Sequence, residues 1–417
     1  MFSISFRSRS SARNRELKRA VLKVFTQSDD CQTEQLAVYS ESDWKGVLRW
    51  LDICGMALYF LDQARRTGVD RLVPQSILAE LDGRLERNRE RTTTLMREAS
   101  LLCGWFDAGG IPYALLKGFT LTPDSVPDAA LRWQADLDIL VPRRFVNLAR
   151  HYISRLGYTL HADTGRTLEF RAGAVEMPDI SKLYSVHSER ALELHVDDGQ
   201  SDALNCRRIR DFKGVRISTL SPADILVQQA LHLLKHLCGE HTRLSWVLEF
   251  RRHVETRKAD AAFWAEARLV AAQVQNGDLA MGVAFWLAKA MFGPLDCVTP
   301  ASWRAEALPE RVGLWLRFYA DEVLLSDAAG SKFYALLRGE IPGQCDEGKS
   351  ARRILLPVCW PSRMGRPSRR ERLRPRGHRY LIESQYFLTR LRFHVMEGFR
   401  FAIEVSRWRR AVARCGR

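Results

Sequence analysis

Residues 131–141 read Leu-Arg-Trp-Gln-Ala-Asp-Leu-Asp-Ile-Leu-Val, and Leu115-Leu116-Lys117-Gly118 precedes them. Asp136 and Asp138 are one residue apart in an apolar alternating run, so a strand would point both carboxylates to one face. On a half-buried strand such a pair is costly unless a cation lies between the acids, and Mg²⁺ is the obvious one. A solvated strand end is the alternative. With a lysine–glycine turn upstream that could hold a phosphate, the stretch predicts metal-dependent phosphoryl or nucleotidyl transfer.

Hydrophobic periodicity predicts a small sheet between two helical regions. Apolar residues recur at helical spacing over 43–108, with a break at Val73-Pro74. A helix is expected over 142–156, and strand-like runs occupy 113–116, 135–141, 167–171, 180–186 and 191–196. Ser221 and Pro222 have the N-cap and first-turn chemistry that begins a second helical region. We therefore expect an α+β fold, a small mixed β-sheet core flanked by N-terminal and C-terminal helical regions.

These patterns divide the chain into six segments. They are a flexible N-terminus (1–42), an N-terminal helical region (43–110), the α/β core (111–220), a helical domain (221–339), a basic Gly/Pro/Arg-rich connector (340–379) and a basic amphipathic helical tail (380–417).

The positive charge of the chain is concentrated at its C-terminal end. Residues 349–417 contain 19 Lys or Arg and 4 Asp or Glu, whereas the rest of the chain has 45 of each, so this segment carries the whole net charge of +15. Three interpretations remain open for it. It is a solvated arm, a contact for nucleic acid or another polyanion, or a membrane-surface helix in which Phe, Leu and Trp408 mix with arginine.

Cysteine usage and hydropathy indicate a cytoplasmic globular protein. The nine cysteines are scattered and form neither a C-x-x-C pair nor a cluster at zinc spacing, which fits reduced thiols. The most apolar stretch, residues 280–293, is too short to span a bilayer and contains Lys289. Residues 1–14 have no apolar core typical of a secretion signal.

Five motifs in order resemble the uncharacterised bacterial nucleotidyltransferase family of the DNA-polymerase-β-like superfamily. The likeness covers about residues 43–290, and the ordered set is more specific than any single motif. The motifs are Gly-Ile-Pro-Tyr-Ala-Leu-Leu-Lys-Gly at 110–118, Arg132 with Asp-Leu-Asp-Ile-Leu-Val at 136–141, Leu-Glu-Leu-His at 192–195, Leu-His-Leu-Leu-Lys-His at 231–236 and Leu-Ser-Trp-Val-Leu at 244–248.

The resemblance implies three carboxylates on adjacent strands that hold two Mg²⁺ or Mn²⁺ ions around the phosphates of an NTP. Asp136 and Asp138 match the first pair, and Glu193 takes the third place as a metal ligand and catalytic residue. Asp197 and Asp198 are rivals for that place, but only Glu193 has alternating apolar neighbours.

The resemblance also implies a nucleotide-binding set of Lys117, Gly118, Thr120 and Arg132. Here the sequence departs from the superfamily, because Phe119 follows Gly118 where Ser or Gly is usual, so that Thr120 is the first hydroxyl of the turn. Ala135 stands where family members often have serine. Both changes remove potential hydrogen bonds to phosphate. Arg132 suits either a phosphate contact or a structural ion pair.

The histidines are less specific. His232 and His236 are four residues apart and share one helix face, a spacing that can bind metal. No third ligand accompanies them or His241 locally, so ordinary hydrogen-bonded or core histidines are favoured. His195 shares the face of Glu193 only if its strand is regular.

The sequence therefore predicts an enzyme that transfers an NMP group from an NTP to an acceptor hydroxyl and releases pyrophosphate. The acceptor is left open among small molecules, glycans and macromolecules, as is the base of the NTP. The alternative is a catalytically weak or inactive scaffold of the same fold that binds a polyanion through residues 349–417.

Overall fold

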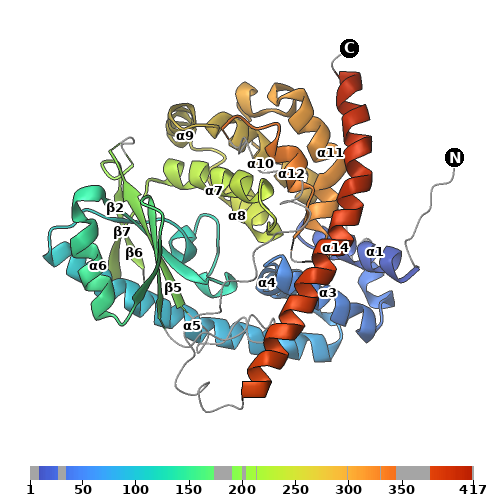
Figure 1. Cartoon of the computed structure of the whole chain (residues 1–417), viewed down its shortest axis with the longest axis horizontal. Helices are drawn as coiled ribbons and strands as arrows, with labels where there is room; N and C mark the ends of the chain where they lie inside the picture. The colour runs from blue at the N-terminus through green and yellow to red at the C-terminus, as the bar shows by residue number, and fades with distance from the viewer. Residues whose placement is uncertain are drawn as a thin grey trace.

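The computed structural model describes residues 9–26, 34–172, 190–199, 203–212, 214–297, 299–328, 330–343 and 376–415. In Figure 1 a β-sheet stands beside a larger body of helices, and one long helix, α5, runs beneath both. The helices are α1 (Arg9–Lys23), α3 (Glu41–Ile53), α4 (Ala57–Thr67), α5 (Gln75–Ala108), α6 (Val146–Arg155), α7 (Pro222–Leu237), α8 (Leu244–Thr256), α9 (Ala261–Gln273), α10 (Gly277–Phe292), α11 (Glu310–Leu324), α12 (Tyr334–Arg338) and α14 (Arg376–Cys415).

One mixed sheet of seven strands forms the α/β part, in the order β3-β4-β5-β2-β1-β7-β6. The strands are β1 (Ala114–Leu115), β2 (Asp136–Pro142), β3 (Thr159–Asp163), β4 (Thr167–Ala172), β5 (Arg190–Asp197), β6 (Arg208–Phe212) and β7 (Val215–Thr219). The central strand β2 pairs parallel with β5 and antiparallel with β1. The predicted α+β arrangement, a mixed sheet flanked by helices, is confirmed.

The alternation in β2 divides its side chains between the two faces of the sheet. Leu137, Ile139 and Val141 are fully buried in a core that α5 and α6 cover. Asp136 and Asp138 therefore lie on the opposite face. The same division holds in β5, where Leu192 and Leu194 enter that core.

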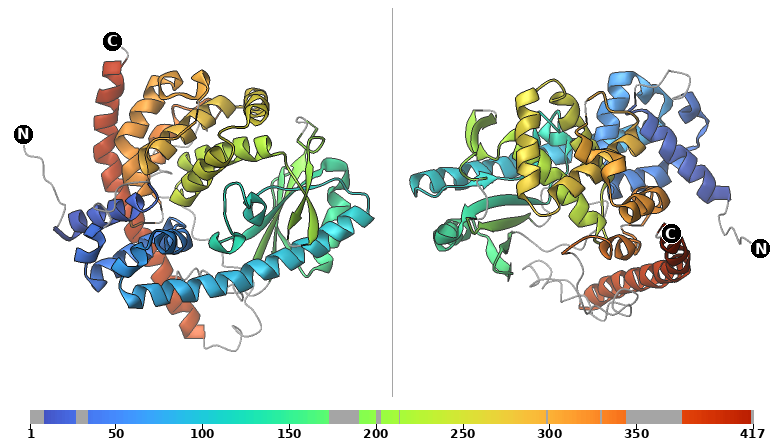
Figure 2. Two further views of the ribbon diagram at one scale, coloured as in Figure 1. Left: turned by 180° about the vertical axis from the view of Figure 1, so that it is seen from behind. Right: turned by 90° about the horizontal axis from the view of Figure 1, so that it is seen from above.

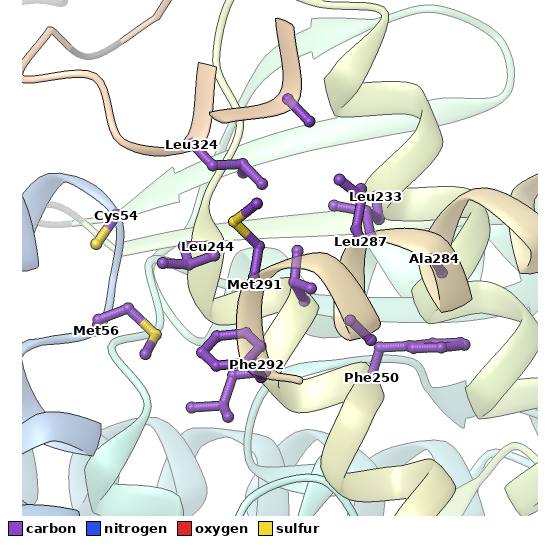
Figure 3. Packing of buried hydrophobic residues seen from close by; sticks show 14 of the residues in the cluster. Cys54, Met56, Leu233, Leu244, Phe250, Ala284, Leu287, Met291, Phe292 and Leu324 are labelled. Atoms are coloured by element: carbon purple, nitrogen blue, oxygen red, sulfur yellow. The ribbon is translucent and has the colours of Figure 1, made fainter. Parts of the chain in front are cut away.

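A second, larger core lies among the helices. Figure 3 shows part of it, where Phe250 of α8 and Leu287, Met291 and Phe292 of α10 pack near Met56. Helix α7 begins as predicted, with Ser221 at the N-cap accepting a hydrogen bond from the Asp224 amide and Pro222 in its first turn.

Helix α5 belongs to both cores. Ile77, Leu81 and Leu85 in its first half pack in the helical core, whereas Leu102 and Phe106 in its second half pack against the sheet. One continuous helix of 34 residues therefore fixes the sheet relative to the helical body (Figure 2).

The structure differs from the sequence prediction at several elements. Part of the segment predicted to be a flexible N-terminus forms α1, because Leu17 and Val21 are fully buried in the helical core. Strand β3 was not predicted because every residue in it is exposed and gives no alternation, and β6 and β7 were also missed. The strand predicted over 180–186 lies outside the described residues. Within them, no helix is long and apolar enough to cross a bilayer.

Candidate functional site

Two acidic side chains face each other across the central pair of strands. Asp138 of β2 lies directly opposite Glu193 of β5 in the parallel ladder, on the face turned away from the apolar core. Neighbouring strands lie about 4.8 Å apart, so two carboxylates in register are close enough to share one cation. The two regular strands thus bring together residues 55 positions apart in the chain.

His195 completes a group of three possible metal ligands. One ligand atom each from Asp138, Glu193 and His195 lies within 4.8 Å of the others. The Nε2 atom of His195 is 2.9 Å from Oδ1 of Asp138 and 3.5 Å from Oε2 of Glu193. Two carboxylates and an imidazole are a donor set that suits a divalent cation. The strand stays regular to His195, so the side chain shares the face of Glu193.

Lys117 lies beside the same group. Its Nζ atom donates a hydrogen bond to Oδ1 of Asp138 at 2.9 Å. Burial alone would raise the pKa of the Asp138 carboxyl, but the Lys117 ammonium and His195 hold that pKa well below its ordinary value. Asp138 is therefore ionised at neutral pH and is already bound to two cationic or donor groups.

Asp136 is in a different electrostatic position, although it is on the same strand face. It is not a member of the three-residue group formed by Asp138, Glu193 and His195. Its burial, and next the charge of Asp138, raise the pKa of Asp136 to about 6. Two acids two residues apart on one strand thus have pKa values shifted in opposite directions.

The lysine–glycine turn is locked to β2 by Gln134. The Phe119 amide donates to Oε1 of Gln134 at 3.1 Å, and Nε2 of Gln134 donates to the Asp136 carbonyl at 2.6 Å. Gly118 has a φ of +76°, and a Cβ atom there would lie 2.2–2.3 Å from the Gln134 side chain. Glycine is therefore required by conformation and by space.

Helix α5 holds the segment that leads into β2. The Nδ2 atom of Asn88 donates to the Ala130 carbonyl at 2.6 Å, and Nε of Arg91 donates to the Gln134 carbonyl at 2.9 Å. Both side chains are buried at the middle of α5, between its two apolar halves. The position of Asp136 is therefore tied to the helix that joins the two cores.

Thr120 and Arg132, like Lys117, are predicted nucleotide-binding residues that have partners inside the protein. The Thr120 hydroxyl is buried and donates to the Lys117 carbonyl at 3.0 Å. The Arg132 guanidinium lies 3.2 and 3.3 Å from the two oxygens of Glu249, a buried residue of α8 that also accepts a hydrogen bond from Tyr59. Phosphate binding by Thr120 and Arg132 stays a prediction.

A pocket connects Lys117 with the helical body. Its empty volume is about 350 Å³, a figure that includes space open to solvent. Its lining includes Leu116, Lys117, Arg132, His232 and Trp246. The lysine is therefore accessible from the side of α7 and α8 as well as from the sheet.

The histidines of α7 pack around Trp246 in one wall of that region. The ring centroids of His232 and His236 are each 4.5 Å from that of Trp246. Burial lowers the pKa of His232 to about 2 and that of His236 to about 4. Both rings are neutral at physiological pH, and they form an aromatic wall.

The rival acids lie farther along β5. Asp197 is paired with Pro142 at the end of the ladder. It is four residues beyond Glu193, which corresponds to about 13 Å along a strand. Asp198 forms an exposed ion pair with Arg143. Among the described acids of β5, only Glu193 joins Asp138.

Sequence reasoning missed several residues that shape the site. Gln134, Asn88 and Arg91 were not identified because an amide or a guanidinium that holds backbone carbonyls leaves no periodic signal. His195 could have been assigned, because its parity with Glu193 is visible in Leu-Glu-Leu-His once the strand is taken as regular.

The family model for uncharacterised nucleotidyltransferases matches residues 40–293. The chain belongs to this nucleotidyltransferase family. No curated protein matches the sequence. Four chains of known structure match, among them an antigenic nucleotidyltransferase-like protein from Paracoccidioides brasiliensis, at 15% identity and a TM-score of 0.28. That match covers 46% of this chain and 92% of the other.

We predict that neutralising the two aspartates has opposite effects on stability. Asp136→Asn should raise the free energy of unfolding at pH 7.5 by about 1–2 kcal/mol, because it removes a carboxylate whose ionisation is disfavoured in the folded state. The gain should be present above pH 6 and vanish as pH falls toward 4. Asp138→Asn should lower the free energy of unfolding by about 1–3 kcal/mol, because Lys117 loses its partner.

Denaturant unfolding at several pH values measures both changes. Asp163→Asn, on the exposed strand β3, is the matched control and should change stability by less than about 0.5 kcal/mol. A loss of stability in Asp136→Asn at pH 7.5 would contradict the electrostatic account.

We predict that Gly118→Ala destabilises the protein by about 1–3 kcal/mol more than Gly157→Ala. Both glycines have positive φ, but nothing lies within 4 Å of a Cβ atom at Gly157. Gly157→Ala is therefore the control, and it is destabilised only by placing alanine in a left-handed backbone conformation. The excess is the cost of displacing Gln134. Equal losses in thermal or denaturant unfolding would show that Gln134 moves aside freely.

Proposed function

We propose that the protein is a metal-dependent nucleotidyltransferase that moves an NMP group from an NTP to an acceptor hydroxyl. The observation that supports this most directly is the group of Asp138, Glu193 and His195 beside Lys117, on adjacent strands of a chain of this family. A cation site next to a lysine-bearing turn suits a triphosphate, because the cation and the lysine would both neutralise its negative charge.

The proposed reaction is a single displacement at the α-phosphorus. The acceptor oxygen forms a bond to that phosphorus, the bond to the bridging oxygen of the β-phosphate breaks, and pyrophosphate leaves with the bonding electrons. The acceptor proton passes to solvent by way of Glu193, because its side chain is 34% exposed whereas that of Asp138 is 2% exposed. Mg²⁺ or Mn²⁺, when bound, neutralises charge on the phosphates and acidifies the acceptor hydroxyl.

The residues of the chain have separate tasks in this scheme. Asp138, Glu193 and His195 would hold the cation, with Asp136 joining them once it is ionised. Lys117 would donate to a phosphate oxygen in place of Asp138 when that carboxylate has a cation as its partner. The turn at Gly118 keeps the lysine within reach of the sheet face.

We predict that purified protein transfers label from an α-labelled NTP in the presence of Mg²⁺ or Mn²⁺. A screen of the four NTPs against cell extract identifies base and acceptor together. Asp138→Asn and Glu193→Gln should each reduce labelling by about 10²-fold or more, because each removes charge where the transition state needs it.

Asp197→Asn and Asp198→Asn are the matched controls, since they neutralise the rival acids of the same segment and should retain labelling. Transfer that survives Asp138→Asn and Glu193→Gln would contradict the assignment. Calorimetry that detects no metal-dependent NTP binding would favour the non-catalytic scaffold.

We also predict that the site prefers Mn²⁺ to Mg²⁺ because His195 supplies an imidazole ligand, which suits Mn²⁺ better. Titration calorimetry should show that His195→Ala weakens Mn²⁺ binding by about tenfold or more and Mg²⁺ binding by less. His161→Ala, an exposed histidine of β3, is the control. Equal losses for the two ions would contradict the preference for Mn²⁺, and no loss for either ion would remove His195 from the ligand set.

A further inference from the structure

The C-terminal helix α14 presents an apolar stripe to solvent. Leu388, Leu391, Val395, Met396, Phe399 and Ile403 have exposed fractions of 40–74%. Their spacing of three, four or seven residues places them along one side of the helix. In the part of the chain that the structure describes, no other element exposes more than one large apolar side chain. The stripe is therefore a distinct surface.

The opposite side of α14 holds the helix against the body of the protein. Phe401 and Trp408 are buried in the helical core. Glu404 accepts a hydrogen bond from Tyr319 of α11 at 3.3 Å, and Arg400 is 3.0 Å from Glu322 of the same helix. Figures 1 and 2 show α14 along the outside of the helical region. The apolar stripe therefore faces outward because the other side of the helix is fixed.

Arginines accompany the stripe. Arg392 lies within it, and Arg409, Arg410 and Arg414 follow its C-terminal end. All four are exposed, and none forms an ion pair with another described residue. They belong to the segment that carries the whole net positive charge of the chain. The surface thus combines exposed aliphatic and aromatic groups with cations that lack acidic partners.

We propose that α14 docks the protein on an anionic membrane surface. In the docked state the helix lies in the plane of the interface, its apolar stripe enters the acyl region and its arginines contact lipid phosphates. Leu388 to Ile403 spans about 22 Å of helix, a length suited to lying flat.

Charge and apolarity together argue against two other occupants. A nucleic acid would satisfy the arginines but leave the aliphatic stripe without an apolar partner. A second copy of the chain would cover the stripe but bring two strongly basic helices together. An anionic lipid surface satisfies both features at once. The proposal is independent of the transfer reaction, since no residue of α14 belongs to the site.

Sedimentation of the full chain with lipid vesicles tests the proposal. The protein should bind vesicles that contain phosphatidylglycerol, and bind phosphatidylcholine vesicles at least about tenfold more weakly. Phe399→Ser combined with Ile403→Ser should reduce partitioning by about tenfold or more without changing charge. Leu269→Ser, at an exposed leucine of α9, is the matched control and should leave it unchanged.

A second variant tests the charges alone. Arg409→Gln combined with Arg414→Gln should weaken vesicle binding by about fivefold for each arginine. Raised salt should also weaken vesicle binding by the natural chain. Thermal unfolding shows whether the variants remain folded, and NTP labelling should be equal in all of them.

Absence of binding to anionic vesicles by the natural chain would overturn the proposal. So would binding that the stripe variant retains, binding of single-stranded RNA without binding of vesicles, or a dimer in solution that the stripe variant dissociates.

Discussion

The arrangement of the site depends on a buried carboxylate between two donors. Asp138 is held by Lys117 from the turn and by His195 from β5, so a charge that would be costly to bury is stabilised in place. The same contacts fix the turn and the two central strands relative to each other. Asp138, Glu193 and His195 would hold a cation here in a geometry that their existing contacts already organise.

Much of the sheet was predictable because alternating apolar and polar residues identify both a strand and its buried face. Asp136 and Asp138 alternate with buried Leu137 and Ile139, so both the strand and the polar face follow from the spacing. Glu193 between two leucines gives the same information. Prediction failed where this signal is absent, as in β3, which buries no residue.

The supporting contacts could not be predicted because they join positions with no common pattern. Gln134 fills the space beside Gly118, and Arg91 binds a carbonyl 43 residues away. The pairing of Arg132 with Glu249 likewise depends on the approach of α8 to the sheet. The local sequence shows which polar side chains need hydrogen-bond or ion-pair partners. The partners themselves are known only from the three-dimensional structure.

Helix α5 has a consequence for how a substrate enters. A single helix is built into both cores, and its Arg91 holds the segment that leads into the strand with the aspartates, so both halves are tied to one shared element. The pocket between Lys117 and the aromatic wall therefore lies between parts that this helix holds in place. A site organised in this way spares the binding energy that ordering two separate parts around a ligand would cost.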